Sequence, residues 1–134
     1  MAGSFSNFLE LEVLDHVFGA AVYTAPATLY IALYTVAPTD AAGGTEVTGG
    51  AYARKDVANN ATNFPAASAG AKSNGVAVTF VTATANWGTV VAFGIFDAVT
   101  AGNLLAWADL AVNKAVNSGD TAVFNIGDID LTLD

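Results

Sequence analysis

The sequence predicts an all-β fold: an antiparallel β-sandwich of jelly-roll type with seven or eight strands, preceded by one N-terminal α-helix. The spacing of apolar residues changes from three or four to two near Pro26, and short strand-like stretches separated by turn residues continue from Val76 to the end. A chain of 134 residues can build one domain with its own core. We therefore expect a single domain over 1–134, with a helix at 5–18 and the sandwich at 27–134.

The first part of the chain has a helical period. Its apolar residues are spaced by threes and fours, whereas acidic residues and His16 occupy the rest of the helix circumference. Ser4 or Ser6 is suited to cap the start of this helix, and Gly19 is suited to end it. The apolar residues are Phe5, Phe8, Leu9, Leu11, Val13, Leu14, Val17 and Phe18.

The apolar band of this predicted helix is wider than packing on one small domain requires. One stripe can pack on the domain, and the remainder can meet another chain. We therefore expect the helix to dock the protein onto a partner. The docking residues predicted from the sequence are Phe5, Phe8, Leu9, Leu11 and Val13.

The stretch from Thr28 to Thr35 alternates with a period of two, which is typical of a strand. Because both of its faces are apolar, we expect this strand to be central in the sheet. A flexible, glycine-rich connection follows at 38–50, and extended character resumes at 51–57. The two faces of the strand carry Leu29, Ile31 and Leu33 on one side and Tyr30, Ala32 and Tyr34 on the other.

Five further strands are expected after a long loop. The stretch 59–74 is rich in Asn, Ser and Gly and has Phe64 as its only bulky residue, so we expect a loop lying over the surface. Turn residues such as those at 117–120 separate the strands that follow. These strands are predicted at Val76–Thr82, Thr89–Asp97, Asn103–Leu110, Thr121–Ile126 and Ile129–Leu133.

The large apolar residues of these strands are the candidates for the core and for interfaces. Trp107 is expected to be largely buried, because it follows Leu104 and Leu105 in a strand with apolar neighbours. The full set is Trp87, Phe93, Ile95, Phe96, Leu104, Leu105, Trp107, Leu110, Phe124, Ile126, Ile129, Leu131 and Leu133.

The composition excludes several classes of partner. The net charge of −8 repels a nucleic-acid backbone, and the absence of a run of 18 apolar residues argues against a membrane span. The chain contains no Cys, which excludes thiol nucleophiles and cysteine-based metal sites. Only 12% of the residues are charged while 54% are apolar, so we expect sister chains to cover part of the surface in a homo-oligomer. We also expect a soluble protein made in a cytoplasm.

No pattern of catalytic, cofactor-binding or metal-binding residues is found in the sequence. His16 is the only histidine, and no Gly-x-Ser-x-Gly motif marks a nucleophile. Asp128 and Asp130 share a face of an extended strand, but solvated edge carboxylates explain them more simply than a metal site. We therefore expect no enzyme activity and no cofactor.

Nine short segments together resemble a family of small bacteriophage structural proteins often labelled tail fibre proteins. They occur in the same order over nearly the whole chain. The segments are NFLE at 7–10, LDHVFG at 14–19, YTAPATLY at 23–30, GGTEV at 43–47, GGAYAR at 49–54, WGTV at 87–90, FGIFD at 93–97, GNLLAW at 102–107 and NSGD at 117–120.

The resemblance implies a structural protein of the virion, synthesised in the host cytoplasm. Because a 134-residue knob is small for a fibre, we expect capsid decoration (a cement role), with a tail fibre, neck or baseplate subunit as the alternative. The partners it implies are sister copies, as a trimer, and other phage proteins such as the major capsid or tail proteins. A further alternative is binding of a host-surface glycan or receptor, with the stretch 59–74 and nearby aromatic residues holding the sugar.

Overall fold

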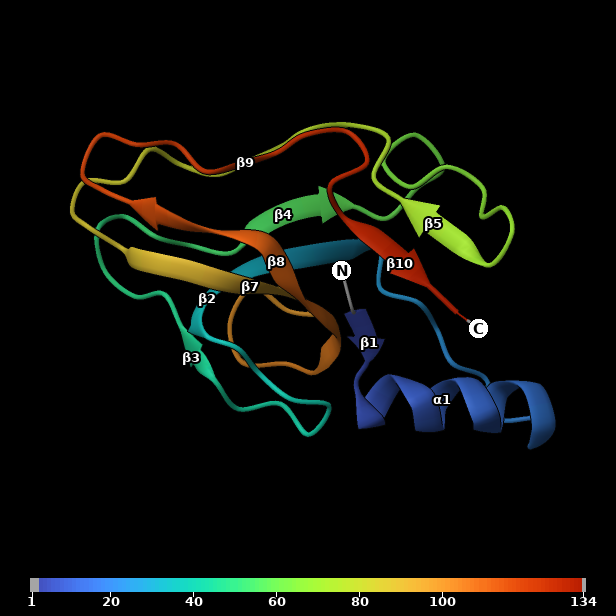
Figure 1. Ribbon diagram of the computed structural model, residues 1–134. Helices are drawn as coiled ribbons and strands as arrows, with labels where there is room; N and C mark the ends of the chain where they lie inside the picture. Colours follow the sequence, from blue (N-terminus) through green and yellow to red (C-terminus); the bar gives the residue numbers. More distant parts are fainter. Residues whose placement is uncertain (1–2, 134) are drawn as a thin grey trace.

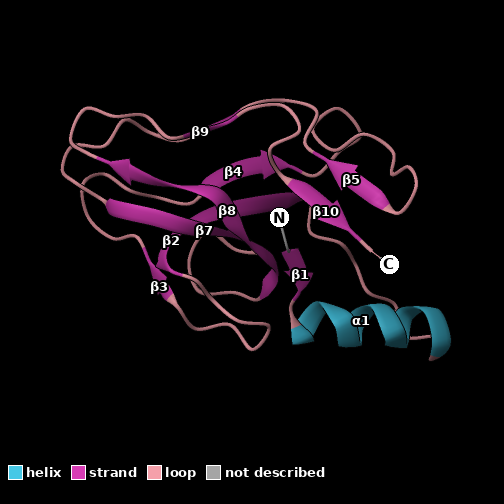
Figure 2. Ribbon diagram, in the orientation of Figure 1, coloured by secondary structure: helices cyan, strands magenta, loops and turns pink. Residues whose placement is uncertain are grey.

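The computed structural model describes residues 3–133 of the chain. Within this range the chain forms one helix and ten strands, and the first of these strands precedes the helix (Figure 2). The elements are β1 (Gly3–Phe5), α1 (Asn7–Phe18), β2 (Thr28–Val36), β3 (Thr45–Glu46), β4 (Lys55–Ala58), β5 (Ala71–Ser73), β6 (Val78–Thr79), β7 (Gly88–Phe96), β8 (Leu104–Val116), β9 (Val123–Phe124) and β10 (Asp130–Thr132).

Six of the strands form one antiparallel sheet. Its order is β1-β8-β7-β2-β3, and β4 also pairs with β2 (Figure 1). Two short antiparallel pairs, β5 with β10 and β6 with β9, account for the other strands of residues 3–133. The mostly-β antiparallel fold with an N-terminal helix is therefore confirmed. The described sheet does not close into a barrel, and a jelly roll is not shown, because one sheet holds most of the strand residues.

Strand β2 is central, as the sequence predicts. It pairs with β7 along one edge and with β3 and β4 along the other, and its side chains alternate between two apolar clusters. Ile31 and Leu33 belong to the larger cluster, whereas Ala32 and Tyr34 belong to the smaller one on the opposite face. Both faces of this strand are buried because each carries apolar side chains.

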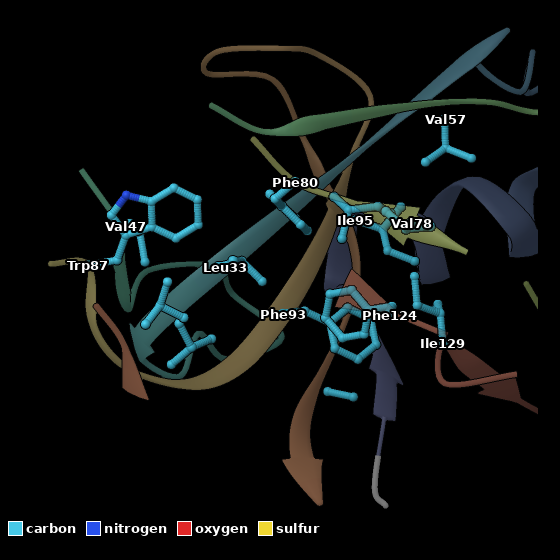
Figure 3. Packing of buried hydrophobic residues seen from close by; sticks show 14 of the residues in the cluster. Leu33, Val47, Val57, Val78, Phe80, Trp87, Phe93, Ile95, Phe124 and Ile129 are labelled. Carbon is cyan, nitrogen blue, oxygen red and sulfur yellow. The ribbon is translucent and has the colours of Figure 1, made fainter. Parts of the chain in front are cut away.

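The larger core lies between the main sheet and the segments that cover it. Phe93 of β7 is fully buried at its centre, and its ring meets the ring of Phe124 edge to face, with centroids 5.3 Å apart (Figure 3). Val78 of β6 and Ile129, the residue before β10, pack into the same cluster. The chain after β8 therefore folds back over the sheet, and β6 packs into the same cluster.

Several strand boundaries differ from the prediction. Strand β8 continues to Val116 rather than ending at Leu110, because pairing with β7 supports residues whose own pattern is polar and irregular. Strands β6 and β9 have two residues each, since they pair only briefly before the chain diverges into turns. Strands β1, β3 and β5 are too short for a period of two to be visible in the sequence.

The burial of some predicted core residues also differs. Trp107 is partly buried and packs against the smaller cluster, so its predicted burial is confirmed in part. Ile126 and Leu133 are exposed, because they lie in a turn and beyond the last strand. Leu110 and Leu131 are half-buried. The candidates confirmed as buried are Trp87, Phe93, Ile95, Phe96, Leu104, Leu105, Phe124 and Ile129.

The stretch 59–74 is more ordered than the predicted surface loop. It includes β5, its Phe64 is buried in the main core, and Asn74 is 1% exposed. The sequence gives no sign of this because a buried Asn needs hydrogen-bond partners from segments distant in the chain.

Candidate docking surface

Helix α1 begins at Asn7, two residues later than predicted, and Phe5 belongs to β1 instead. Phe5 lies opposite Ala106 in the antiparallel pairing of β1 with β8. Its backbone is therefore extended and cannot be the first turn of a helix. Ser6 is the N-cap, as one of the two predicted candidates, and its Oγ accepts a hydrogen bond from the N–H of Leu9 at 3.2 Å.

The domain holds the helix mainly at its first turn. The N–H of Ser6 donates to the carbonyl of Leu105 at 2.8 Å, and the N–H of Asn7 donates to the carbonyl of Asp40 at 2.9 Å. Beyond this point the helix has no fully buried residue, and it ends at Gly19 as predicted. Figure 1 shows α1 at one corner of the molecule, away from β3 and β9.

The five predicted docking residues divide into two groups. Phe5, Phe8 and Leu9 are half-buried where the helix and β1 meet β8, so they serve the attachment of α1 to its own domain. Leu11 is 63% exposed and Val13 is also exposed. Only these two are available to a partner in the folded chain.

The remaining exposed apolar residues of α1 were not among the predicted docking residues. Leu14, Val17 and Phe18 are all exposed, and Phe18 reaches 83%. Together with Leu11 they form what we call the α1 apolar face, since residues three, four and seven apart share one side of a helix. Their spacing is visible in the sequence, but which side faces the domain is not.

Helix α1 exposes apolar side chains on the side that faces away from its domain, where an ordinary surface helix is polar. Its half-buried positions include Phe8, Leu9 and the acidic residue Glu12, whereas the α1 apolar face points to solvent. A contiguous exposed apolar surface of this kind is typical of a protein interface. The geometry therefore makes α1 the candidate docking surface.

Tyr23 lies in the segment between α1 and β2 and contacts the helix. Burial, followed by the charges of Asp97 and Glu12, raises the pKa of Tyr23. The exposed ring of His16 accepts a hydrogen bond at Nδ1 from the N–H of Tyr23 at 3.2 Å. The histidine therefore has a structural contact in the turn that follows the helix.

A half-buried ion pair fixes the loop between β7 and β8. Arg54 donates from Nε and Nη2 to the two carboxylate oxygens of Glu46 at 2.9 and 2.8 Å, and from Nη1 to the carbonyls of Ala98 and Ala101. The guanidinium also lies over the ring of Phe96, 3.6 Å from its centroid. These charged groups are therefore used within the fold.

Two tyrosines beside this ion pair make stability depend on pH. Burial and the charge of Glu46 raise the pKa of Tyr34 to about 12, and burial raises the pKa of Tyr52, whose hydroxyl donates to Glu46. In the unfolded chain tyrosine ionises near pH 10, so above about pH 10 the folded state binds more protons than the unfolded state. We expect the free energy of unfolding to fall as the pH rises from about 10 to about 12.

Urea unfolding followed by tryptophan fluorescence across this pH range measures the effect. Tyr34→Phe removes one of the ionising groups, so the fall is expected to be smaller in that variant. A free energy of unfolding that stays level up to about pH 12 would contradict the raised pKa values of Tyr34 and Tyr52.

Besides the α1 apolar face, an apolar groove lies between β8 and the segment 120–128. This groove has a volume of about 640 Å³, and on the β8 side it is lined by 110–112 and 114–116. The residues 110–113 lie opposite a single residue of β7, so they form a long bulge in β8. Its charged residues are Lys114, Asp120 and Asp128, and both aspartates accept hydrogen bonds from backbone N–H groups of their own turns. The groove thus contains no set of groups arranged for catalysis among the described residues.

The described residues, 3–133, hold no metal-binding cluster and no helix long enough to span a membrane. Across residues 3–133, no three His, Asp or Glu side chains come together in a group that could hold a metal ion. The only helix of that range is too short to cross a membrane. Phe64, the one aromatic residue of the stretch 59–74, is buried and offers no exposed ring for stacking on a sugar.

Comparison with known families gives one match. The family model described as podophage GP4 fiber I protein gp80 matches residues 4–132. No curated protein matches the chain at a significant level.

Proposed function

Because the chain belongs to the podophage GP4 fiber I protein family over residues 4–132, we propose that it is a tail-fibre subunit that attaches to a neighbouring virion protein through the α1 apolar face. Membership makes the chain a phage fibre protein, a non-enzymatic structural part of the virion, as the sequence predicts. A tail fibre, the alternative that the sequence also predicts, fits this family better than capsid decoration does. A fibre protein associates with other tail or fibre proteins of the phage.

The observation that carries the attachment proposal is the outward orientation of the α1 apolar face. Removing a Leu, Val or Phe side chain from water contributes about 1.5–3 kcal/mol each, before the cost of ordering the two partners. Four such side chains therefore supply enough free energy for stable docking, and several subunits bound together strengthen it further. The helix can be covered without unfolding the domain, because only its first turn is packed.

Particle incorporation of variants tests this function. Leu14→Asp with Phe18→Asp places two charges in the α1 apolar face, where the native side chains are 53% and 83% exposed. We expect a folded protein with a normal circular dichroism spectrum that is at least tenfold depleted from purified particles. Changing Phe5 and Phe8 instead would be uninformative, because both are half-buried against the domain.

The control carries the same two charges on other exposed apolar residues. Val112→Asp with Ile126→Asp alters β8 and the turn before β10, where the native side chains are also mostly exposed. This control is expected to incorporate normally. Normal incorporation of the α1 variant would refute attachment through the helix.

The homo-oligomer, with a trimer as the favoured state, remains a prediction from composition and resemblance. Light scattering of the purified chain at micromolar concentration measures it, and a 13.5 kDa species alone would count against self-association in solution.

A further inference from the structure

The α1 apolar face is bordered by unpaired acidic side chains. Glu10 precedes Leu14 by four residues, and Asp15 follows Leu11 by four, so each carboxylate lies beside a member of the face. Both acidic side chains are exposed, and among the described residues neither carboxylate forms an ion pair or a side-chain hydrogen bond. A partner that covers the apolar face therefore meets these two charges at its edge.

Further carboxylates lie away from the α1 apolar face. Glu12 is half-buried on the side of α1 that faces the domain, and burial, the charge of the loop residue Asp97 and the charge of Glu12 raise the pKa of Tyr23. Asp97 accepts hydrogen bonds from Asn103, which orient its carboxylate but leave its charge in place. Four carboxylates thus lie on or near this helix, without a Lys or Arg on the helix itself.

A second copy of the chain is poorly suited to cover this surface. Each copy carries a net charge of −8 and only four basic residues. Arg54 already forms an ion pair with Glu46, and Lys55 forms one with Asp56. Lys72 donates to a backbone carbonyl, and Lys114 lies in the groove beside two aspartates. A sister chain therefore has few free cations for a complementary rim.

Resting on the proposed attachment through α1, we propose that the protein receiving this helix is a different virion component, with an apolar groove bordered by lysine or arginine side chains. The apolar floor of that groove takes the side chains of the α1 apolar face, and its basic rim faces Glu10 and Asp15. Complementary rim charges speed association and exclude wrong partners, among them sister copies of the same acidic chain. Self-association of the chain, predicted from its composition, then uses another surface.

Charge reversal at the border tests the proposal. Glu10→Lys with Asp15→Lys changes the net charge by +4 and leaves the α1 apolar face intact. The control, Asp109→Lys with Asp130→Lys, makes the same change in net charge at exposed acidic residues on β8 and β10 that have no ion-pair partner among the described residues. Each variant is supplied to infected cells in place of the wild type, and the copies per purified particle are counted.

We expect the border variant to be incorporated at least tenfold less than the wild type and the control to stay within about twofold of it. Intact particles carrying the wild-type chain are also washed in salt. Because the screening length falls from about 10 Å at 0.1 M to about 3 Å at 1 M, the wild-type chain is expected to be released more readily in 1 M NaCl.

The outcomes separate this inference from the proposed function. If the Leu14→Asp, Phe18→Asp variant is lost from particles while the border variant is incorporated normally, attachment through α1 stands and the basic-rimmed partner is refuted. If purified wild-type chain forms an oligomer that the Leu14→Asp, Phe18→Asp changes dissociate, the face is a contact between copies and the inference is also overturned. Normal incorporation of both α1 variants would reject the two proposals together.

Discussion

Asn74→Asp is expected to remove about 3–5 kcal/mol of folding stability at neutral pH, a large part of the 5–15 kcal/mol available to a typical domain. The side chain of Asn74 is buried and joins two segments of the chain, 74–76 and 125–129. Its Nδ2 donates to the carbonyls of Val76 and Asn125, both at 2.8 Å, and its Oδ1 accepts from the N–H of Ile129 at 2.9 Å. An aspartate cannot donate to those carbonyls, and its charge would face their oxygen atoms without a cation.

The cost should fall as the pH is lowered toward about 4, because a protonated carboxyl group is uncharged and can donate one hydrogen bond. Urea unfolding at two pH values measures both effects. Asn113→Asp makes the same chemical change at an exposed position of β8 and is expected to alter stability by less than about 0.5 kcal/mol. Equal effects of the two substitutions would show that the amide of Asn74 does not join these segments.

Trp87→Ala is expected to destabilise the fold by about 3–5 kcal/mol, and Trp107→Ala by about half as much. The ring of Trp87 is buried, it meets the ring of Tyr52 edge to face at 5.3 Å, and its Nε1 donates to the carbonyl of Gly50 at 2.9 Å. Trp107 is half-buried, and its main polar contact is a hydrogen bond from Nε1 to the carboxylate of Asp40 at 2.9 Å. Trp107→Ala therefore loses less buried apolar surface than Trp87→Ala does.

The two single-tryptophan proteins can be compared directly by urea unfolding monitored by circular dichroism, which does not depend on the remaining indole. A larger loss of stability on removing Trp107 would contradict the burial difference. It would mean that the contact with Asp40, which also holds the start of α1, is worth more than the packing of Trp87.

The elements that were predicted well are those whose signal is local. The alternation of Ile31 with Ala32 and of Leu33 with Tyr34 places each side chain on the face that it occupies, because side chains alternate along any extended strand. The cap at Ser6 was one of two predicted candidates, since a serine side chain can satisfy the free N–H groups of the first turn. The wide apolar band of the helix was also visible in the sequence, from the spacing of its apolar residues.

The elements that were missed depend on partners distant in the chain. The strand at Gly3–Phe5 exists because β8 offers an edge for it to pair with, and no pattern within three residues could indicate this. The buried role of Asn74 needs carbonyl and N–H groups that are 51 and 55 residues away. The long bulge in β8 is likewise fixed by its pairing with β7.

The candidate docking surface shows the same division. The sequence by itself determined that the fold is mostly β, that one helix precedes the central strand, that its apolar circumference exceeds what one contact needs, and that acidic residues border it. Only the tertiary structure decided which side of that helix is covered. The contacts of β1 and of the first helical turn with β8 hold Phe5, Phe8 and Leu9 inward. They rotate Leu11, Leu14 and Phe18 into solvent, because helical geometry fixes the opposite side once one side is anchored.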